Sequence, residues 1–286
     1  MKLLNIHDAN LALYEYSKIG ETGETVLLLH PGGFISSYVW NEFVQNFKEN
    51  YRVIAVDFRG HGNSEKTKSG YNMSNLANDI HEVLNQLNIQ SVHIIGNSLG
   101  AEVGLVFAST YSDKVHSLTL IDGGILNLVG PNGERDETKE ELLEERLNRP
   151  YPEYSSKEEF IRFVQENWID FRKIASEIPL YKLDNGKWTF QQPNEIATLI
   201  LEAGCNLDML SLYNHVSCPV LFLPAEKEPK LEQKLKVIEE IKSKLPFIKT
   251  KIIPGSQHIM MLEHCNELSF EIKQFFFDIK NSINSI

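Results

Sequence analysis

VHIIGNSLGAE, residues 92–102, is an apolar, β-branched run that breaks at GNSLG (96–100) before a helix-forming segment begins. A serine on a tight strand-to-helix turn between two glycines is typical of a nucleophile elbow. The glycines are needed because the strand and the helix pass closely beside the serine, where a Cβ atom does not fit. The pattern therefore indicates Ser98 as a candidate nucleophile.

The same turn predicts an electrostatic role for the start of the following helix. The backbone N–H of Leu99 lies in the first helical turn, where no helical carbonyl accepts it, so it is free to meet a developing oxyanion. Two glycines and a serine at this spacing also occur by chance. The interpretation therefore depends on the surrounding strands and on partner residues further along the chain.

Short β-branched runs alternate with amphipathic segments through the first 122 residues. Such alternation predicts an α/β fold with a parallel sheet and helices on both faces. The expected strands are LALYEYS (11–17), VLLLH (26–30), RVIAVD (52–57), VHIIGN (92–97) and VHSLTLID (115–122), and the expected helices are YVWNEFVQNF (38–47), LANDIHEVLNQL (76–87) and AEVGLVFASTY (101–111).

The alternation is interrupted once and then resumes. A helical pattern with no strand signal extends from about residue 136 to 213, which predicts an inserted helical cap. We therefore expect a core formed by residues 1–123 and 208–286, with residues 124–207 as the cap. The resumed pattern consists of the strand PVLFLPA (219–225), a charged helix at about 230–245, the strand IKTKIIP (248–254) and a closing helix from about 262.

Charge and cysteine content limit the expected partners. The net charge is −11 and no block of lysine and arginine occurs, so neither nucleic acid nor an anionic membrane surface is expected as a partner. Cys205, Cys218 and Cys265 have unrelated spacings, which indicates reduced thiols. Neither a signal peptide nor an apolar run of about 20 residues is recognisable, so a cytoplasmic location is expected.

Loops that follow the strands contain further candidate residues. In open parallel sheets the active site lies at the carboxyl ends of the strands. The loop HPGGF (30–34) follows the strand that ends at His30, and its glycines let backbone amides approach a bound carbonyl. Since Pro31 has no N–H, either Gly32 or Gly33 must donate the second hydrogen bond to an oxyanion.

A histidine near the end of the chain is the expected general base. His258 lies in GSQHIMMLEH (255–264), after the strand at 248–254 and before the last helix. An imidazole with an ordinary pKa of ~6.5 can accept the serine proton and later protonate the leaving group. His61, in DFRGHGNS (57–64), is expected to organise its loop by hydrogen bonding instead.

The acid that orients the imidazole has more than one candidate. Any well-placed carboxylate can hold the imidazole tautomer and stabilise the imidazolium. Glu228, three residues beyond the strand at 219–225, is the first choice. Asp122, which closes the strand at 115–122, is the main alternative, followed by Glu226.

Motifs for metal and nucleotide chemistry are missing from the sequence. His81-Glu82 lacks the second histidine of an H-E-x-x-H zinc site, and His258 with Glu263 and His264 does not have the inverse spacing. The chain contains neither a G-x-x-x-x-G-K-[ST] phosphate loop nor a G-x-G-x-x-G dinucleotide turn. Neither a metal nor an organic cofactor is therefore expected.

Together, LLLHPGG (27–33), DFRGHGNSE (57–65), GNSLGA (96–101) and PGSQHIMMLE (254–263) resemble the α/β-hydrolase superfamily, in its single-domain branch with a helical cap. The resemblance implies a mostly parallel sheet of about eight strands. It also implies Ser98 as nucleophile, His258 as base and the position of Glu228 as the acid.

The chain departs from the pattern of this superfamily at three positions. Proline replaces the usual glycine at position 31, and glutamate replaces the more common aspartate at 228. Asn97 stands where histidine is frequent. An asparagine before the serine resembles the elbow of hydrolases that cleave carbon–carbon bonds in ring-cleavage products. The longer glycine-proline oxyanion signature of those enzymes is absent from the sequence.

These features predict a serine hydrolase that cleaves a small to medium, largely apolar carboxylic ester through an acyl-enzyme. Carbon–carbon bond hydrolysis and a non-catalytic, ligand-binding role are the alternatives. A small molecule is the expected partner. Aromatic and aliphatic cap residues are expected to pack inside the cap more often than to contact substrate: Phe160, Phe163, Trp168, Phe171 and Leu180.

Overall fold

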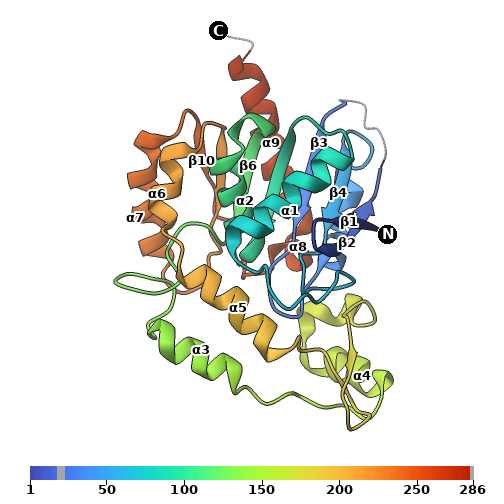
Figure 1. The fold of residues 1–286 in the computed structure, drawn as a ribbon. Coiled ribbons are helices and arrows are strands. Elements are labelled where there is room, and N and C mark those ends of the chain that lie inside the picture. Colours follow the sequence, from blue (N-terminus) through green and yellow to red (C-terminus); the bar gives the residue numbers. More distant parts are fainter. Residues whose placement is uncertain (18–22, 284–286) are drawn as a thin grey trace.

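An eight-stranded sheet forms the centre of the protein (Figure 1). The computed structural model describes residues 1–17 and 23–283. β2 pairs antiparallel with both of its neighbours, β1 and β4, and all other neighbouring strands of this sheet pair parallel. The predicted α/β class, with a mostly parallel sheet flanked by helices, is therefore confirmed. In spatial order the strands are β1 (Lys2–Ile6), β2 (Ala9–Glu15), β4 (Arg52–Val56), β3 (Thr25–Leu29), β5 (Val92–Asn97), β6 (Val115–Ile121), β9 (Val220–Leu223) and β10 (Ile248–Thr250).

Two hydrophobic layers cover the faces of the sheet, and β3 shows how they divide. Leu27 and Leu29 belong to one cluster, whereas Val26 and Leu28 belong to the other. Successive side chains of a strand point to opposite faces, so a central strand must be apolar throughout to serve both clusters. This explains why the central strands read as continuous apolar runs.

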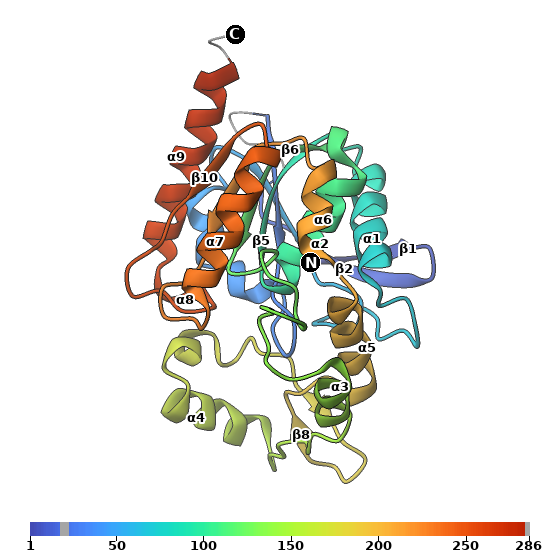
Figure 2. The same ribbon diagram turned by 90° about the vertical axis from the view of Figure 1, so that its left-hand side faces the viewer.

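Each face of the sheet has its own set of helices, as two views of the ribbon show (Figures 1 and 2). One cluster includes buried residues of α1 (Met73–Gln86), α2 (Leu99–Thr110), α6 (Met209–Leu212), α7 (Leu231–Ile241) and the 3₁₀ helix η5 (Tyr213–His215). The opposite cluster includes residues of η1 (Ser37–Trp40), η2 (Phe43–Asn46), α8 (Met260–Glu263) and α9 (Cys265–Ile283). The shorter 3₁₀ helices η3 (Ser112–Lys114) and η6 (Lys242–Lys244) follow α2 and α7.

The segment predicted as one helix at residues 38–47 forms two 3₁₀ turns, η1 and η2, instead. Trp40 and Phe43 in these turns are fully buried, as is Phe47 just after them. Aromatic and β-branched residues have modest helix propensity, so packing against α9 decides the local backbone here. The strand β1 was also not predicted from the sequence.

The chain between β6 and β9 extends away from the sheet and lies beyond the carboxyl ends of its strands (Figures 1 and 2). A strand pair was not expected here, but β7 and β8 form a two-residue ladder around the turn Asp184–Lys187. The limits 124–207 for the cap remain a prediction. The elements within them are α3 (Lys139–Leu147), α4 (Lys157–Asn167), η4 (Ile169–Ile174), β7 (Tyr181–Lys182), β8 (Trp188–Thr189) and α5 (Asn194–Cys205).

Two further findings concern the chain as a whole. Cys205, Cys218 and Cys265 are free thiols, as predicted. Within residues 1–17 and 23–283, a membrane span would require the bent helix pair Asn194–Cys205 and Met209–His215, because each single helix is too short or too polar to cross alone.

Candidate active site

The candidate nucleophile lies on a strained turn between β5 and α2. β5 ends at Asn97, α2 begins at Leu99, and Ser98 between them has φ 53° and ψ −119°. A positive φ is unfavourable for a residue with a side chain and persists only where the surrounding structure enforces it. The turn therefore has the strained geometry that the sequence predicts for a nucleophile elbow.

Close backbone contacts explain the glycines around this turn. A Cβ atom on Gly96 would overlap the carbonyl oxygen of Gly100, and one on Gly100 would overlap the carbonyl oxygen of Leu29. Gly123, just beyond β6, also passes closely, since a Cβ there would lie 2.7 Å from the carbonyl oxygen of Ser98. The predicted need for small neighbours two positions either side of Ser98 is therefore confirmed.

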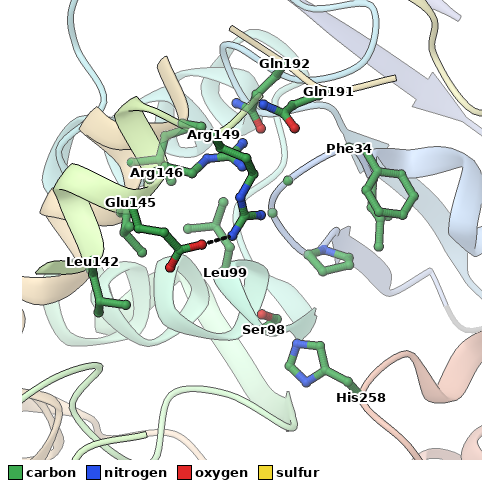
Figure 3. A pocket seen from close by; sticks show the side chains of 18 of the residues that line it. Phe34, Ser98, Leu99, Leu142, Glu145, Arg146, Arg149, Gln191, Gln192 and His258 are labelled. Carbon is green, nitrogen blue, oxygen red and sulfur yellow. Dashed lines mark hydrogen bonds and ion pairs between the residues drawn. The ribbon is translucent and has the colours of Figure 1, made fainter. Parts of the chain in front are cut away.

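Ser98 opens into a pocket of about 1020 Å³ between the sheet and the inserted segment (Figure 3). His258 lines the same pocket, and its ring lies beside the Ser98 side chain in the figure. The chain thus brings together two residues that are 160 positions apart in the sequence. Both lie at the carboxyl edge of the sheet, where connecting loops converge.

The predicted oxyanion donors line this pocket as well. Gly32, Gly33 and Leu99 all contribute to its wall. Gly33 has φ +77°, and a Cβ atom on Gly32 would lie 3.3 Å from Leu99 Cδ2. The glycine loop and the start of α2 are therefore neighbours, although which amide meets an oxyanion remains a prediction.

His30 anchors the glycine loop to the sheet. Its Nε2 accepts a hydrogen bond from the Phe58 N–H at 3.0 Å, so Nδ1 carries the proton and donates to the Pro31 carbonyl at 2.6 Å. Complete burial lowers the pKa of His30 to about 4. The ring is therefore neutral and structural. His61 is also buried, with a pKa lowered to about 3 by burial, and it hydrogen-bonds the Arg59 carbonyl within its own loop, as predicted.

His258 Nδ1 is 2.6 Å from Asp122 Oδ2, and the Asp122 side chain is fully buried. The partner of His258 in the structure is therefore Asp122, the alternative acid. Glu228, the first choice from the sequence, does not form this hydrogen bond. β6 lies between β5 and β9 in the sheet, so Asp122, directly after β6, is one strand from the elbow. Glu228 follows β9, one strand further away.

Glu228 nevertheless lies near the same imidazole. Single ligand atoms of Asp122, Glu228 and His258 lie within 4.8 Å of one another, the only such group among the described residues. This set could hold a metal ion by composition. However, the ammonium of Lys234 is 2.8 Å from Asp122 Oδ1, so that oxygen already has a cationic partner. The arrangement therefore fits acid–base chemistry better than metal ligation.

Lys234 is a component of the site that sequence reasoning missed. Its side chain is only 5% exposed and also lies 3.6 Å from Glu134. A buried ammonium requires such partners, because an isolated charge in the interior is costly. The sequence does contain one signal for a buried lysine here. Lys234 lies on the same helical stripe as Leu231, Ile238 and Ile241, which faces the core.

Opposing effects set the ionisation of this group. Burial disfavours the Asp122 carboxylate, but the hydrogen bond from His258 and the charge of Lys234 outweigh it, so the pKa of Asp122 is lowered. Burial also disfavours the imidazolium of His258, but the hydrogen bond and the charge of Asp122 raise its pKa above the usual value. Asp122 is therefore an anion that stabilises a proton on His258.

Asn97 links the elbow to the histidine loop. Its Nδ2 donates to the Ile121 carbonyl at 2.8 Å and to the His258 carbonyl at 3.0 Å. The sequence marked this position as a departure from the usual histidine and as a resemblance to carbon–carbon bond hydrolases, but it predicted no structural role for the side chain. The structure gives it a positioning role, because one amide joins the end of β6 to the backbone that carries the imidazole.

The wall opposite the elbow combines aromatic and charged side chains. Trp168 lines the pocket, whereas Phe160 is fully buried in the cluster behind it. Sequence reasoning missed the polar groups on this wall, which include Arg135, Arg146, Arg149 and Gln192. Glu102, one turn after Ser98 in α2, also lines the pocket. The expected apolar roof is therefore only part of the wall.

The sheet order and the strained turn at its carboxyl edge define an α/β-hydrolase type of fold. A family model described as alpha/beta hydrolase fold matches residues 25–264, and the chain belongs to this family. Segments of the chain are also similar to curated proteins. An uncharacterized protein of Mycobacterium tuberculosis is 35% identical over 107 residues, which are 37% of this chain and 31% of that protein.

A second curated relative carries a more specific name. It is the 2-hydroxy-6-oxononadienedioate/2-hydroxy-6-oxononatrienedioate hydrolase of Escherichia coli O81, 33% identical over 129 residues. The match covers 43% of this chain and 44% of that enzyme. The chain therefore spans less than half the length of these relatives.

Solved structures match over almost the whole chain. The crystal structure of E-2-(acetamidomethylene)succinate hydrolase has a TM-score of 0.74 at 22% identity, covering 96% of this chain and 98% of that one. A thioesterase domain from the curacin biosynthetic pathway has a TM-score of 0.75 at 17% identity, with coverage of 96% and 98%. At these identities the likeness establishes the fold alone.

Proposed function

We propose that the protein is a serine hydrolase that cleaves a carboxylic ester through an acyl-enzyme. The observation that carries this proposal is the 2.6 Å hydrogen bond between His258 and Asp122 beside the strained Ser98 turn. A nucleophile, a base and an acid that orients the base are the three roles that acyl transfer by serine requires. In this proposal Asp122 takes the role first expected for Glu228.

The proposed reaction has two halves. The Ser98 hydroxyl attacks the ester carbonyl while His258 takes its proton, and the backbone N–H of Leu99 with that of Gly32 or Gly33 stabilises the oxyanion. The imidazolium then protonates the departing alcohol, which leaves an acyl group on Ser98. Water, deprotonated by His258, attacks this acyl group, and the bond to Ser98 breaks as the imidazolium returns the proton to the serine oxygen, which releases the acid.

Two assays test the proposal. The protein is incubated with short p-nitrophenyl esters and, separately, with a fluorophosphonate that labels activated serines. We expect turnover, and labelling at Ser98 that is lost in Ser98→Ala. Labelling of another residue, or hydrolysis that survives Ser98→Ala, would contradict the proposal. A chain that is neither labelled nor active would support the non-catalytic, ligand-binding alternative.

Carbon–carbon bond hydrolysis is the second candidate function. It is favoured by the similarity to the Escherichia coli hydrolase named above and by Asn97 before the serine. A vinylogous diketone assayed beside the p-nitrophenyl esters separates the two reactions. The ester proposal expects the higher kcat/KM on the esters, and a preference for the diketone would favour carbon–carbon cleavage instead.

A further inference from the structure

Arg146 projects from the last turn of α3 into the pocket. Its guanidinium lines the pocket and makes neither a hydrogen bond nor an ion pair with any side chain in the described ranges. Burial and the nearby charge of Arg149 lower its pKa, and the charge of Glu145 offsets this only in part, but an arginine remains charged at neutral pH. A half-buried guanidinium with no direct hydrogen bond or ion pair can bind an anion that enters the pocket.

Gln192 offers a second unsatisfied group to the same pocket. Gln192 is only 1% exposed. Neither the nitrogen nor the oxygen of its side-chain amide has a hydrogen-bond partner among the described residues. Buried polar groups are nearly always paired, and Gln192 lines the pocket, so a ligand there can complete its amide. Gln191 differs, because its amide donates to Asn194 at 2.6 Å.

The remaining charges leave this wall positive. Arg149 is neutralised by Glu145 at 2.7 Å, whereas Arg135 adds a further positive charge at the rim. Burial, together with the charge of Glu134, raises the pKa of Glu102 to about 8, so this carboxyl is mainly neutral at pH 7. Among the residues that line the pocket, three arginines therefore stand against two glutamates, of which Glu102 is mainly neutral.

We propose that Arg146 and Gln192 form a subsite that binds a carboxylate of the substrate. The ester cleaved at Ser98 then carries an anionic group, which replaces the largely apolar substrate expected from the sequence. Figure 3 shows Arg146, Arg149 and Gln192 on the side of the pocket across from Ser98 and His258. The carboxylate therefore lies at the end of the substrate remote from the scissile bond.

The chemistry of the two side chains fits a carboxylate. A guanidinium donates two parallel hydrogen bonds to the two oxygens of a carboxylate, and the Gln192 amide nitrogen donates a further one. The subsite does not touch the reacting atoms, so it acts on substrate binding more than on the chemical step. This proposal rests on the proposed function, in that it names the substrate class of the same site.

Matched esters test the subsite. Mono-p-nitrophenyl glutarate is compared with p-nitrophenyl valerate, and γ-acetoxybutyrate with butyl acetate, so that a carboxylate on either side of the ester is covered. The wild type should prefer the anionic member of at least one pair. Arg146→Met should lower kcat/KM for that member about 10- to 100-fold, mainly through KM, and leave the neutral ester within about 2-fold.

Two further variants complete this test. Gln192→Leu should reduce the same preference by about 10-fold. Arg162→Met is the matched control, since Arg162 is an exposed arginine of α4 outside the pocket lining, and it should change neither ester. Equal kcat/KM for anionic and neutral esters in the wild type, or equal losses on both in Arg146→Met, would overturn the proposal.

A binding experiment separates failure of the subsite from failure of the proposed function. Glutarate should raise the Tm of the wild type and of Arg162→Met, but not of Arg146→Met. A Tm shift that depends on Arg146 supports the subsite even if fluorophosphonate labelling and ester turnover both fail. A shift that is equal in all three proteins, or absent from all three, rejects it.

Discussion

The two walls of the pocket are built in opposite ways. The wall from the core consists of tightly packed backbone, where Gly96 and Gly100 leave no room for a Cβ atom and His30 fixes the adjacent loop. The wall from the inserted segment presents long polar side chains, such as Arg146 and Gln192, that lack partners among the described residues. Backbone packing holds the reacting groups, and side chains on the opposite wall are free to match a substrate.

The largest expected effect is at the core wall. Ser98→Ala should lower kcat on p-nitrophenyl butyrate by ~10⁴-fold or more, because no other group supplies the nucleophile. Arg146→Met on the opposite wall should leave kcat on this neutral ester almost unchanged. Circular dichroism of both variants checks that the fold persists. A loss of similar size in both would remove the distinction between the walls.

The two carboxylates near His258 give the next contrast. Asp122→Asn should lower kcat about 10³- to 10⁴-fold, since the imidazole loses the acceptor that sets its tautomer. Glu228→Gln should change kcat by less than about 10-fold, because it removes only a nearby charge. Steady-state kinetics on one ester measures both. The reverse order of effects would restore Glu228 as the acid.

Glycine substitutions test the packing difference through stability. Gly96→Ala should lower the free energy of unfolding by about 4 kcal/mol or more, because the new methyl overlaps the backbone of α2. Gly186, in the β7–β8 turn, has φ +83° but open space around it. Gly186→Ala should therefore cost only about 1–2 kcal/mol, from the left-handed backbone alone. Urea unfolding measures both, and equal losses would argue against the comparison.

The smallest expected effect is a shift in pH dependence. His258 must be neutral to accept the Ser98 proton, and its pKa is raised, so kcat/KM should fall as the pH drops through a value above 6.5. Lys234→Met removes the positive charge beside Asp122. The carboxylates around His258 then stabilise its imidazolium more strongly, so the fall in activity should move to higher pH.

Lys236→Met is the control for this shift, because Lys236 lies on the exposed face of the same helix. Its pH profile should match that of the wild type. A Lys234→Met profile that moves to lower pH would contradict the proposed coupling between Lys234, Asp122 and His258. Circular dichroism across the pH range separates this coupling from loss of the folded state.

Local patterns explain which parts of the architecture were predictable. The elbow and the central strands follow from residues close in sequence, such as the glycines around Ser98. The two 3₁₀ turns at Ser37–Asn46 and the β7–β8 pair were missed, because tertiary packing and a two-residue ladder leave little periodic signal.

The acid and the pocket wall depend on spatial neighbours. Asp122 and Glu228 each follow a strand, and only the sheet order β5-β6-β9 makes Asp122 the nearer one to the elbow. Arg146 and Gln192 are ordinary polar residues in the sequence, and their lack of partners is visible only in three dimensions. Lys234 is the exception, since a lysine on the apolar stripe of α7 is a signal that periodicity alone reveals.

The central claim is that Ser98 forms a covalent acyl-enzyme with the help of His258 and Asp122. It is tested most directly by mixing the protein with p-nitrophenyl acetate, quenching in acid within the first turnover and mapping the acetyl group by peptide mass spectrometry. The account predicts an acetyl group on Ser98 that is absent from Ser98→Ala and greatly reduced in Asp122→Asn. Rapid release of nitrophenol with no acetyl group on Ser98 would contradict it.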